Sequence, residues 1–181
     1  EGPSWEELLR SRAMRFDVPN VVISLESTPE RRKTFQKYNP SLDYAFFDAI
    51  EGKKVPKKIL SDRTLFRDRV PYTPGAVGCA LSHRILWESA ILSDSPLTIL
   101  EDDAIVREDF EDRKREVLAR LPTDWDIILW GWNFDSILSI LAMPNISPVV
   151  MTFNQDEIRK SVDRFRMNRE PIYSFRLDRC F

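Results

Sequence analysis

Three consecutive carboxylates, Glu101, Asp102 and Asp103, follow an apolar run at residues 97–100. This run predicts a short buried strand, and open α/β sheets bind ligands just beyond the carboxyl ends of their strands. Adjacent negative charges repel one another unless a cation, a hydrogen-bond donor or water relieves them. A hard divalent ion bridging to a diphosphate would do so, because Mg²⁺ and Mn²⁺ prefer oxygen ligands. Alternatively, the acids are solvated in a loop before the next helix, where negative charge suits the helix dipole.

A second group of charged residues follows the two strands predicted near the start of the chain. Arg31 and Arg32 lie in the first turns of a helix after the first strand, where backbone N–H groups and a guanidinium could both face a phosphate. The alternative is an exposed helix face, because Glu30 is adjacent. Asp48 closes the second strand about twenty residues after the turn, where dinucleotide folds place an acid on the ribose hydroxyls. The turn at residues 26–29 has no glycine, which argues against a dehydrogenase-type pyrophosphate turn and leaves a sugar-nucleotide site open.

The only histidine, His83, lies in a predicted helix with Cys79 four residues before it and Trp87 four residues after it, all on one face. A zinc site built from cysteine and histidine needs further ligands at suitable spacing, and none follow in the sequence. Ser82 and His83 are no nucleophile–base pair, because neighbours in a helix point apart. The sequence favours a hydrogen-bonded core histidine, whose loss would mainly reduce stability, over the alternative of a direct catalytic role.

Length and composition predict one globular domain. A chain of 181 residues can bury a sizeable core, and 43% apolar and 31% charged residues are ordinary for a globular protein. The net charge of −2 argues against a nucleic-acid partner. No apolar run is long enough to cross a bilayer. Two cysteines in no disulfide-dense pattern favour a reducing compartment.

Hydrophobic periodicity predicts alternating strands and helices. A capping box at Ser4 and Glu7 predicts a first helix. The first βαβ unit is predicted from two strands, over residues 21–25 and 44–47, and a helix between them. This helix is opened by Ser27 as N-cap with Pro29 in its first turn, and it ends near residue 38. A polar, lysine-rich stretch over residues 51–72 is expected to be a solvated loop. Thr73 and Pro74 then open the longest helix, over residues 75–92, whose apolar residues surround nearly its whole circumference and predict deep burial.

The second half continues the alternation less clearly. The acidic strand is followed by a helix over residues 108–120 and a strand over residues 125–130, which implies a mainly parallel sheet with helices on both faces. Residues 137–141 and 149–153 are expected to be short elements, and residues 156–169 a helix or a mobile segment. The sequence contains no repeat and no internal domain boundary.

Several of these motifs, in this order, resemble glycosyltransferase family 25. This family contains bacterial lipopolysaccharide and lipooligosaccharide galactosyltransferases and relatives of the procollagen galactosyltransferases. The resemblance covers about residues 20–133 and rests on order and spacing. The matching segments are VISL at 22–25 with the two arginines at 31–32, FDAIEG at 47–52, GAVGCALSH at 75–83, WE at 87–88, LEDD at 100–103 and WDIIL at 125–129.

The resemblance implies a GT-A-like fold, that of nucleotide-diphospho-sugar transferases, with a Rossmann-like, mainly parallel sheet. It also implies a UDP-sugar donor, often UDP-galactose, Mn²⁺ or Mg²⁺, and inverting transfer to a glycan acceptor such as lipopolysaccharide. The acidic triplet looks like the metal and donor motif of the family. In this chain, the resemblance assigns Glu101 and Asp103 as metal contacts, with Asp103 as the first choice. It assigns Asp102 and Asp103 as catalytic residues, and leaves the general base unidentified, with Asp102 or a later residue as the candidates.

Further donor contacts follow from the same resemblance. Arg31 becomes a candidate for the phosphates, Asp48 for the ribose or base, and Ser24 and Glu101 for the remaining donor site. By analogy with the family alone, the enzyme would be cytoplasmic, at the inner face of the membrane, without spanning it.

Family members continue past this point with a segment that completes the acceptor side. Residues 1–181 are therefore expected to form a single glycosyltransferase domain that lacks the C-terminal part of the family domain. The alternative is a non-catalytic truncated homologue that acts as a nucleotide-sugar-binding or interaction module. A second alternative is an α/β domain whose acidic loop is only solvated, with no affinity for metal or nucleotide.

Overall fold

The structure, a computed structural model, describes residues 2–12, 20–66, 72–122, 124–131, 138–140, 149–152 and 154–171. The chain divides into two compact units, Glu1–Ala104 and Ile105–Phe181, and each is described by itself. Whether the whole chain forms the single domain expected from the sequence stays a prediction. Within the described residues, no helix has both the length and the apolar character needed to cross a membrane.

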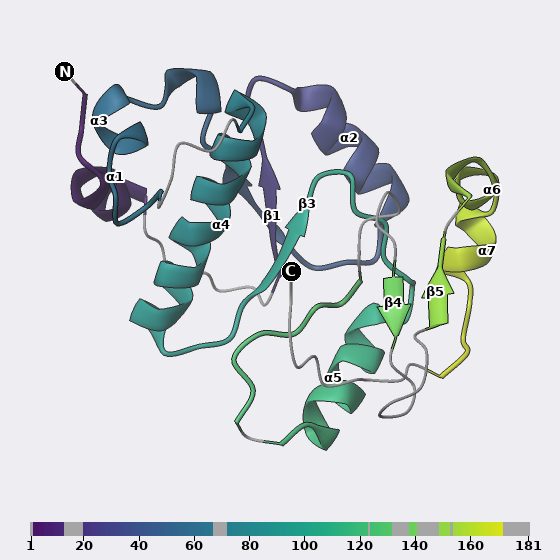
Figure 1. Ribbon diagram of the computed structural model, residues 1–181. Helices are drawn as coiled ribbons and strands as arrows, with labels where there is room; N and C mark the ends of the chain where they lie inside the picture. The colour runs from purple at the N-terminus through teal and green to yellow at the C-terminus, as the bar shows by residue number, and fades with distance from the viewer. Residues whose placement is uncertain are drawn as a thin grey trace. The chain divides into compact units, whose positions relative to one another are not determined.

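The first unit is built on a parallel sheet of three strands in the order β2-β1-β3 (Figure 1). These strands are β1 (Asn20–Ser24), β2 (Ala45–Asp48) and β3 (Thr98–Glu101). All five residues of β1 are buried, as expected for a β-branched run covered on both faces of a parallel sheet. The predicted βαβ unit and the acidic strand are confirmed within one or two residues.

Helices cover both faces of this sheet, as the sequence predicts. On one face, α4 (Pro74–Ser93) packs its buried apolar residues against β1 and β2. This core includes Val21, Ile23, Phe47, Val77, Leu81, Ile85 and Leu86. On the other face, α2 (Pro29–Tyr38) places the ring of Phe35 5.0 Å from that of Tyr44 and 6.1 Å from that of Phe46. Because Phe46 and Phe47 alternate along β2, their side chains point to opposite faces.

Helix α4 begins and ends as its sequence indicates. The Thr73 hydroxyl accepts a hydrogen bond from the N–H of Ala76 at 3.2 Å, and Asp94 ends the helix in the left-handed region at φ 48°. The expected deep burial is wrong for one side. Ile91 is 77% exposed and Leu92 66% exposed, because α4 lies on one face of a small sheet that covers only the side facing it.

The capping box of α1 (Trp5–Arg12) is confirmed. The N–H of Ser4 donates to Glu7 Oε2 at 2.7 Å, and the N–H of Glu7 donates to the Ser4 hydroxyl at 3.3 Å. The capping box expected at the start of α2 is wrong: Thr28 rather than Ser27 is the N-cap, and it makes no capping bond through its side chain.

Two glycines allow the segment after β2 to cross the first turns of α4 at backbone contact. A Cβ atom at Gly78 would lie 2.3 Å from the carbonyl oxygen of Ile50, and one at Gly52 would lie 1.6 Å from that of Pro74. The segment continues as the 3-10 helix η1 (Gly52–Lys54) and the short helix α3 (Lys57–Leu60). Ile59 of α3 is 1% exposed, so the expectation of a wholly solvated loop over residues 51–72 is wrong.

The second unit contains α5 (Phe110–Arg120), the antiparallel pair β4 (Leu138–Ile140) and β5 (Val149–Met151), and the helices α6 (Gln155–Lys160) and α7 (Val162–Arg166). The strand expected over residues 125–130 is not formed. A strand requires a hydrogen-bonded partner, and these described residues carry no ladder; Ile127 is 68% exposed and Leu129 63% exposed.

The glycine contact predicts opposite effects for two substitutions in the same helix. Gly78→Ala should lower the free energy of unfolding by about 1–3 kcal/mol, because the added methyl meets backbone that must move. Gly75→Ala should be neutral or stabilise by up to about 1 kcal/mol, because its Cβ meets nothing closer than 3.8 Å and alanine favours helix. Urea unfolding of both variants measures the difference, and equal stabilities would contradict the packing at Gly78.

Candidate functional site

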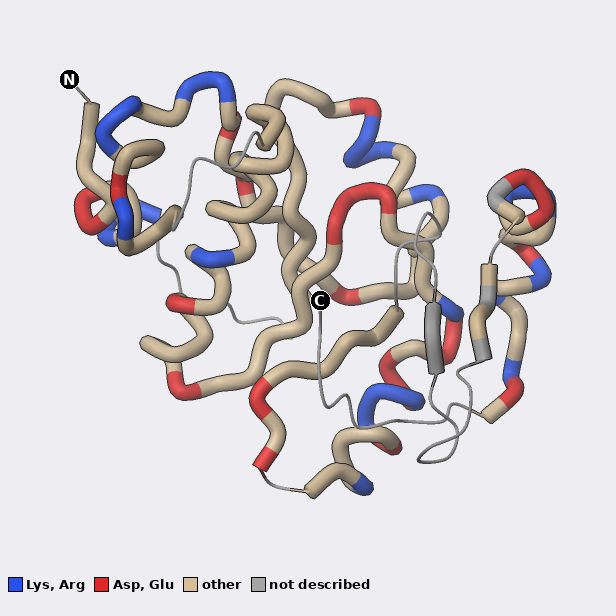
Figure 2. The backbone as a smooth tube through the Cα atoms, in the orientation of Figure 1, with Lys and Arg blue, Asp and Glu red and all other residues tan. Residues whose placement is uncertain are grey.

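The register of the sheet brings its polar strand ends to one edge. Ser24 at the end of β1 pairs with Asp48 at the end of β2, and Ile23 pairs with Glu101 at the end of β3. The acidic residues after β3 therefore lie beside the basic first turns of α2, which starts just after β1 (Figure 2). This is the edge at which open α/β sheets bind ligands.

Asp102 is the buried centre of this edge, with 7% of its surface exposed. Its Oδ1 accepts a hydrogen bond from Arg31 Nε at 2.7 Å and a second from Arg31 Nη2, and its Oδ2 accepts from the Ser24 hydroxyl at 2.8 Å. Burial raises the pKa of Asp102, but the hydrogen bonds from Arg31 and Ser24 outweigh it and hold the pKa below its ordinary value. Both carboxylate oxygens are thus occupied within the protein.

Arg32 contacts the ends of both β1 and β2. Its Nη2 donates to the carbonyl oxygen of Ser24 at 3.1 Å and forms an ion pair with Asp48. Its guanidinium lies 4.8 Å from the ring centre of Phe46. Sequence reasoning grouped Arg32 with Arg31 as a candidate for phosphate, but its described contacts are with the protein. Asp48 remains 57% exposed and accessible to a ligand.

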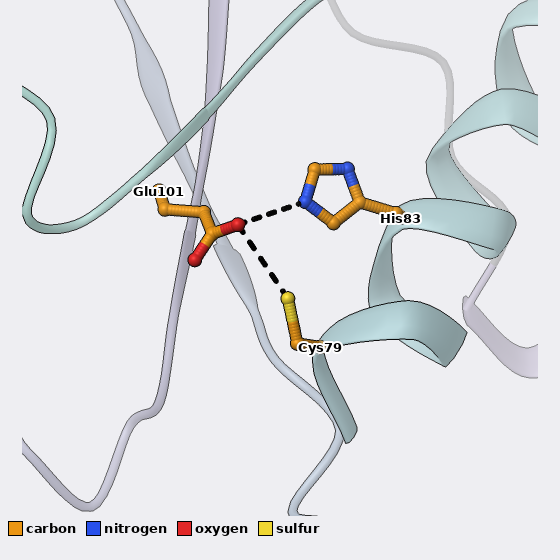
Figure 3. A group of neighbouring side chains, drawn as sticks. All are labelled: Cys79, His83 and Glu101. Atoms are coloured by element: carbon orange, nitrogen blue, oxygen red, sulfur yellow. Dashed lines mark hydrogen bonds and ion pairs between the residues drawn. The ribbon is translucent and has the colours of Figure 1, made fainter. Parts of the chain in front are cut away.

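Glu101 faces α4 rather than α2. Its Oε1 lies 3.3 Å from His83 Nε2 and accepts a hydrogen bond from Cys79 Sγ at 3.5 Å (Figure 3). The contact with His83 lowers the pKa of Glu101. Burial, followed by the charge of Glu101, raises the pKa of Cys79 to about 11.

The contact with Glu101 changes the role expected for His83 from the sequence. The expected hydrogen bond is present, but the expected core position is wrong, because the His83 side chain is 25% exposed and reaches the acidic strand end. Sequence spacing along α4 placed Cys79 and His83 on one face. It gave no signal that β3 would bring a carboxylate to that face.

Exposure separates the site residues predicted from sequence into two groups. Ser24 and Asp102 are buried and bind each other, so they form the base of the site. Glu101 is 50% exposed and Asp103 70% exposed, so both carboxylates are accessible to solvent. Arg31 is 52% exposed and bridges the groups, with Nη2 3.4 Å from Asp103 Oδ2. An arrangement of exposed oxygen ligands beside a fixed guanidinium suits a divalent ion and a phosphate.

Comparison with known sequences identifies the family. The profile described as "Glycosyltransferase family 25 (LPS biosynthesis protein)" matches residues 17–173, most of the chain. The chain belongs to glycosyltransferase family 25. The resemblance inferred from the motifs is therefore confirmed, and the match extends beyond the part that the motifs cover.

Individual relatives come from animals and bacteria. A glycosyltransferase 25 family member of Aedes aegypti is 34% identical over 123 residues, 61% of this chain and 20% of the relative. Procollagen galactosyltransferase 1-A of Xenopus laevis is 30% identical over 65% of this chain and 21% of the relative. Lipooligosaccharide biosynthesis protein lic2B of Haemophilus influenzae is 32% identical over 49% of this chain and 35% of the relative. The chain thus spans between a fifth and about a third of the length of these relatives.

The buried ion pair predicts unequal effects for two neighbouring aspartates. Asp102→Asn should lower the free energy of unfolding by about 1–3 kcal/mol, because it removes a charged acceptor from Arg31 and Ser24. Asp103→Asn should change it by no more than about 0.5 kcal/mol, because Asp103 is exposed. Urea unfolding without added metal compares them.

The pH dependence of this difference follows from the lowered pKa of Asp102. Because the folded-state pKa lies below the unfolded value of about 3.9, the stabilisation is fully present above that value. It is lost as the pH falls through the folded pKa. A stability difference between wild type and Asp102→Asn that grew on acidification would contradict the assigned ion pair.

Proposed function

We propose that this chain transfers a sugar, specifically galactose, from a UDP-sugar to a hydroxyl of a glycan acceptor such as lipopolysaccharide, with inversion at the anomeric carbon. We further propose that its sheet is the core of a GT-A-like fold. The observation that carries the proposal is two exposed carboxylates, Glu101 and Asp103, at the ligand-binding edge of the sheet in a family 25 chain, with Asp103 beside Arg31.

The residues at this edge fit a hard divalent ion. Glu101 and Asp103 offer exposed carboxylate oxygens, the ligands that Mn²⁺ and Mg²⁺ prefer. They flank Asp102, which the protein holds with its own donors and which is therefore a positioning residue in this proposal. When bound, such an ion supplies positive charge that stabilises the UDP leaving group.

Arg31 is the proposed contact for the diphosphate. Its Nε and Nη2 bind Asp102, which fixes the plane of the guanidinium and leaves Nη1 to face a phosphate oxygen. Asp48, oriented by its ion pair with Arg32, is the proposed contact for the ribose or the base. The buried Ser24 hydroxyl contributes indirectly, because it orients Asp102.

The proposed transfer is a single displacement. The acceptor hydroxyl attacks the anomeric carbon, the bond from that carbon to the phosphate oxygen breaks, and UDP leaves with the bonding electrons. The hydroxyl proton passes to a general base. Asp102 stays a sequence-based prediction for that base; its burial and its two occupied oxygens favour positioning instead.

The proposed acceptor also sets a proposed location. By analogy with the family, an enzyme acting on a glycan of the cell envelope would work at the cytoplasmic face of the membrane through peripheral contact. Support for that acceptor, not for the location, comes from the family description, which names lipopolysaccharide biosynthesis, and from the lipooligosaccharide biosynthesis relative.

Calorimetric titration of UDP and UDP-galactose into the chain, with and without Mn²⁺, tests the donor site. We expect binding that depends on Mn²⁺ and that Asp103→Asn weakens about tenfold or more, because it removes one charged ligand of the ion. Glu6→Gln on α1 is the matched control: it also removes one exposed carboxylate, and it should leave binding unchanged.

Three outcomes would discriminate between the candidate functions. Absence of nucleotide binding by the folded chain in either condition would overturn the proposal. Binding that Asp103→Asn leaves intact would overturn the metal assignment. Donor binding without hydrolysis or transfer would favour the second candidate, a nucleotide-sugar-binding module.

A further inference from the structure

Three different donor atoms converge where α4 passes the end of β3. Cys79 and His83 lie one turn apart on α4 and point toward the same carboxylate oxygen of Glu101 (Figure 3). The sulfur, the imidazole nitrogen and the oxygen all lie within 4.8 Å of one another. Among the residues that the structure describes, this is the one group of three such ligands.

Two of the three distances between these atoms match the edges of a tetrahedral site, and the third, from Cys79 to His83, is within 4.8 Å against the ideal of about 3.5 Å. Zinc lies about 2.3 Å from a thiolate, about 2.0 Å from an imidazole nitrogen and about 2.0 Å from a carboxylate oxygen. At the tetrahedral angle, such bonds separate sulfur from oxygen by about 3.5 Å and nitrogen from oxygen by about 3.3 Å. The corresponding distances here are 3.5 Å from Cys79 Sγ to Glu101 Oε1 and 3.3 Å from His83 Nε2 to the same oxygen.

The backbone that carries these ligands is held firmly. The Ser82 hydroxyl, between them in sequence, accepts a hydrogen bond from the N–H of Ile50 at 2.8 Å and donates to the carbonyl of Gly78 at 2.7 Å. Gly78 is in backbone contact with the segment after β2. Ligands four residues apart on a fixed helix reach one ion from the same face.

The degree of exposure leaves room for a fourth ligand. The His83 side chain is 25% exposed and that of Glu101 50% exposed, so solvent reaches both of these ligands. Three protein ligands with an open fourth position are the usual arrangement of a reactive zinc site, in which water or substrate completes the tetrahedron. A thiolate and an imidazole select zinc-like ions over Mg²⁺.

We propose that Cys79, His83 and Glu101 form a binding site for a zinc-class transition-metal ion with one position open to water or an exogenous ligand. This site goes beyond the proposed donor site, because Cys79 and His83 are not ligands of the ion placed at Glu101 and Asp103. It shares Glu101 with that site.

Cobalt absorption tests the site, because Co²⁺ replaces zinc and reports its ligands by colour. The titration uses the full chain carrying Cys180→Ser, which leaves Cys79 as its sole thiol. We expect one equivalent of Co²⁺ to give a sulfur-to-cobalt charge-transfer band and the intense visible bands of a tetrahedral ion. Zn²⁺ should displace the cobalt, because a d¹⁰ ion loses no ligand-field stabilisation in a tetrahedral site, whereas Mg²⁺ should not, because it prefers oxygen ligands.

Matched variants assign the ligands. Cys79→Ser should abolish the charge-transfer band, and His83→Asn should weaken cobalt binding roughly tenfold or more, because each loses a direct ligand. Asp103→Asn should retain the band. Circular dichroism and urea unfolding establish that each variant is folded, and Cys79→Ala provides a second thiol deletion if the serine variant is not.

The outcomes separate this proposal from the donor site. A folded parent protein without the charge-transfer band, or a band that survives Cys79→Ser, would overturn the zinc-class site. A band lost in folded Asp103→Asn would also overturn it, because the ion would then belong to the acidic triplet. If the band is present but UDP does not bind, the zinc-class site stands and the proposed function fails.

Discussion

The parallel register of three short strands is the constraint on which the site depends. Hydrogen bonding between β1, β2 and β3 places Ser24, Asp48 and Glu101 at one edge, although they are far apart in the sequence. The chain must then turn after each strand at this same edge, so the first turns of α2 and the segment after β3 meet there. A buried carboxylate at Asp102 and a guanidinium at Arg31 satisfy each other at that meeting point.

Local signals predicted most of the first unit. The β-branched run around Val21, the proline at the first position of α2, and Thr73 before α4 each act within a few residues, and the structure confirms the elements that they indicate. The extent of burial around α4 was predicted less well. Apolar residues all round a helix indicate that every side of it could be buried. In this structure only the side of α4 that faces the small sheet is buried.

Contacts between segments that are far apart in the sequence could not be predicted from the sequence. Residues 125–130 have the composition of a strand, but a strand also needs a partner, which composition does not specify. In the candidate site, too, local sequence signals were informative and long-range contacts were not predicted. The acidic triplet and Arg31 could be named as candidates from sequence, because each lies beside a predicted strand end. The approach of Glu101 to Cys79 and His83 was missed, because it depends on how α4 crosses β3.

The pairing of Arg31 with Asp102 has a further thermodynamic consequence. An arginine side chain carries about 2 kcal/mol of rotamer entropy, and here much of that freedom is lost on folding, when the guanidinium docks against the buried carboxylate. A phosphate that meets Arg31 therefore finds a preorganised donor, and little conformational entropy remains to be lost on association. The ion pair thus transfers an entropic cost from ligand binding to folding.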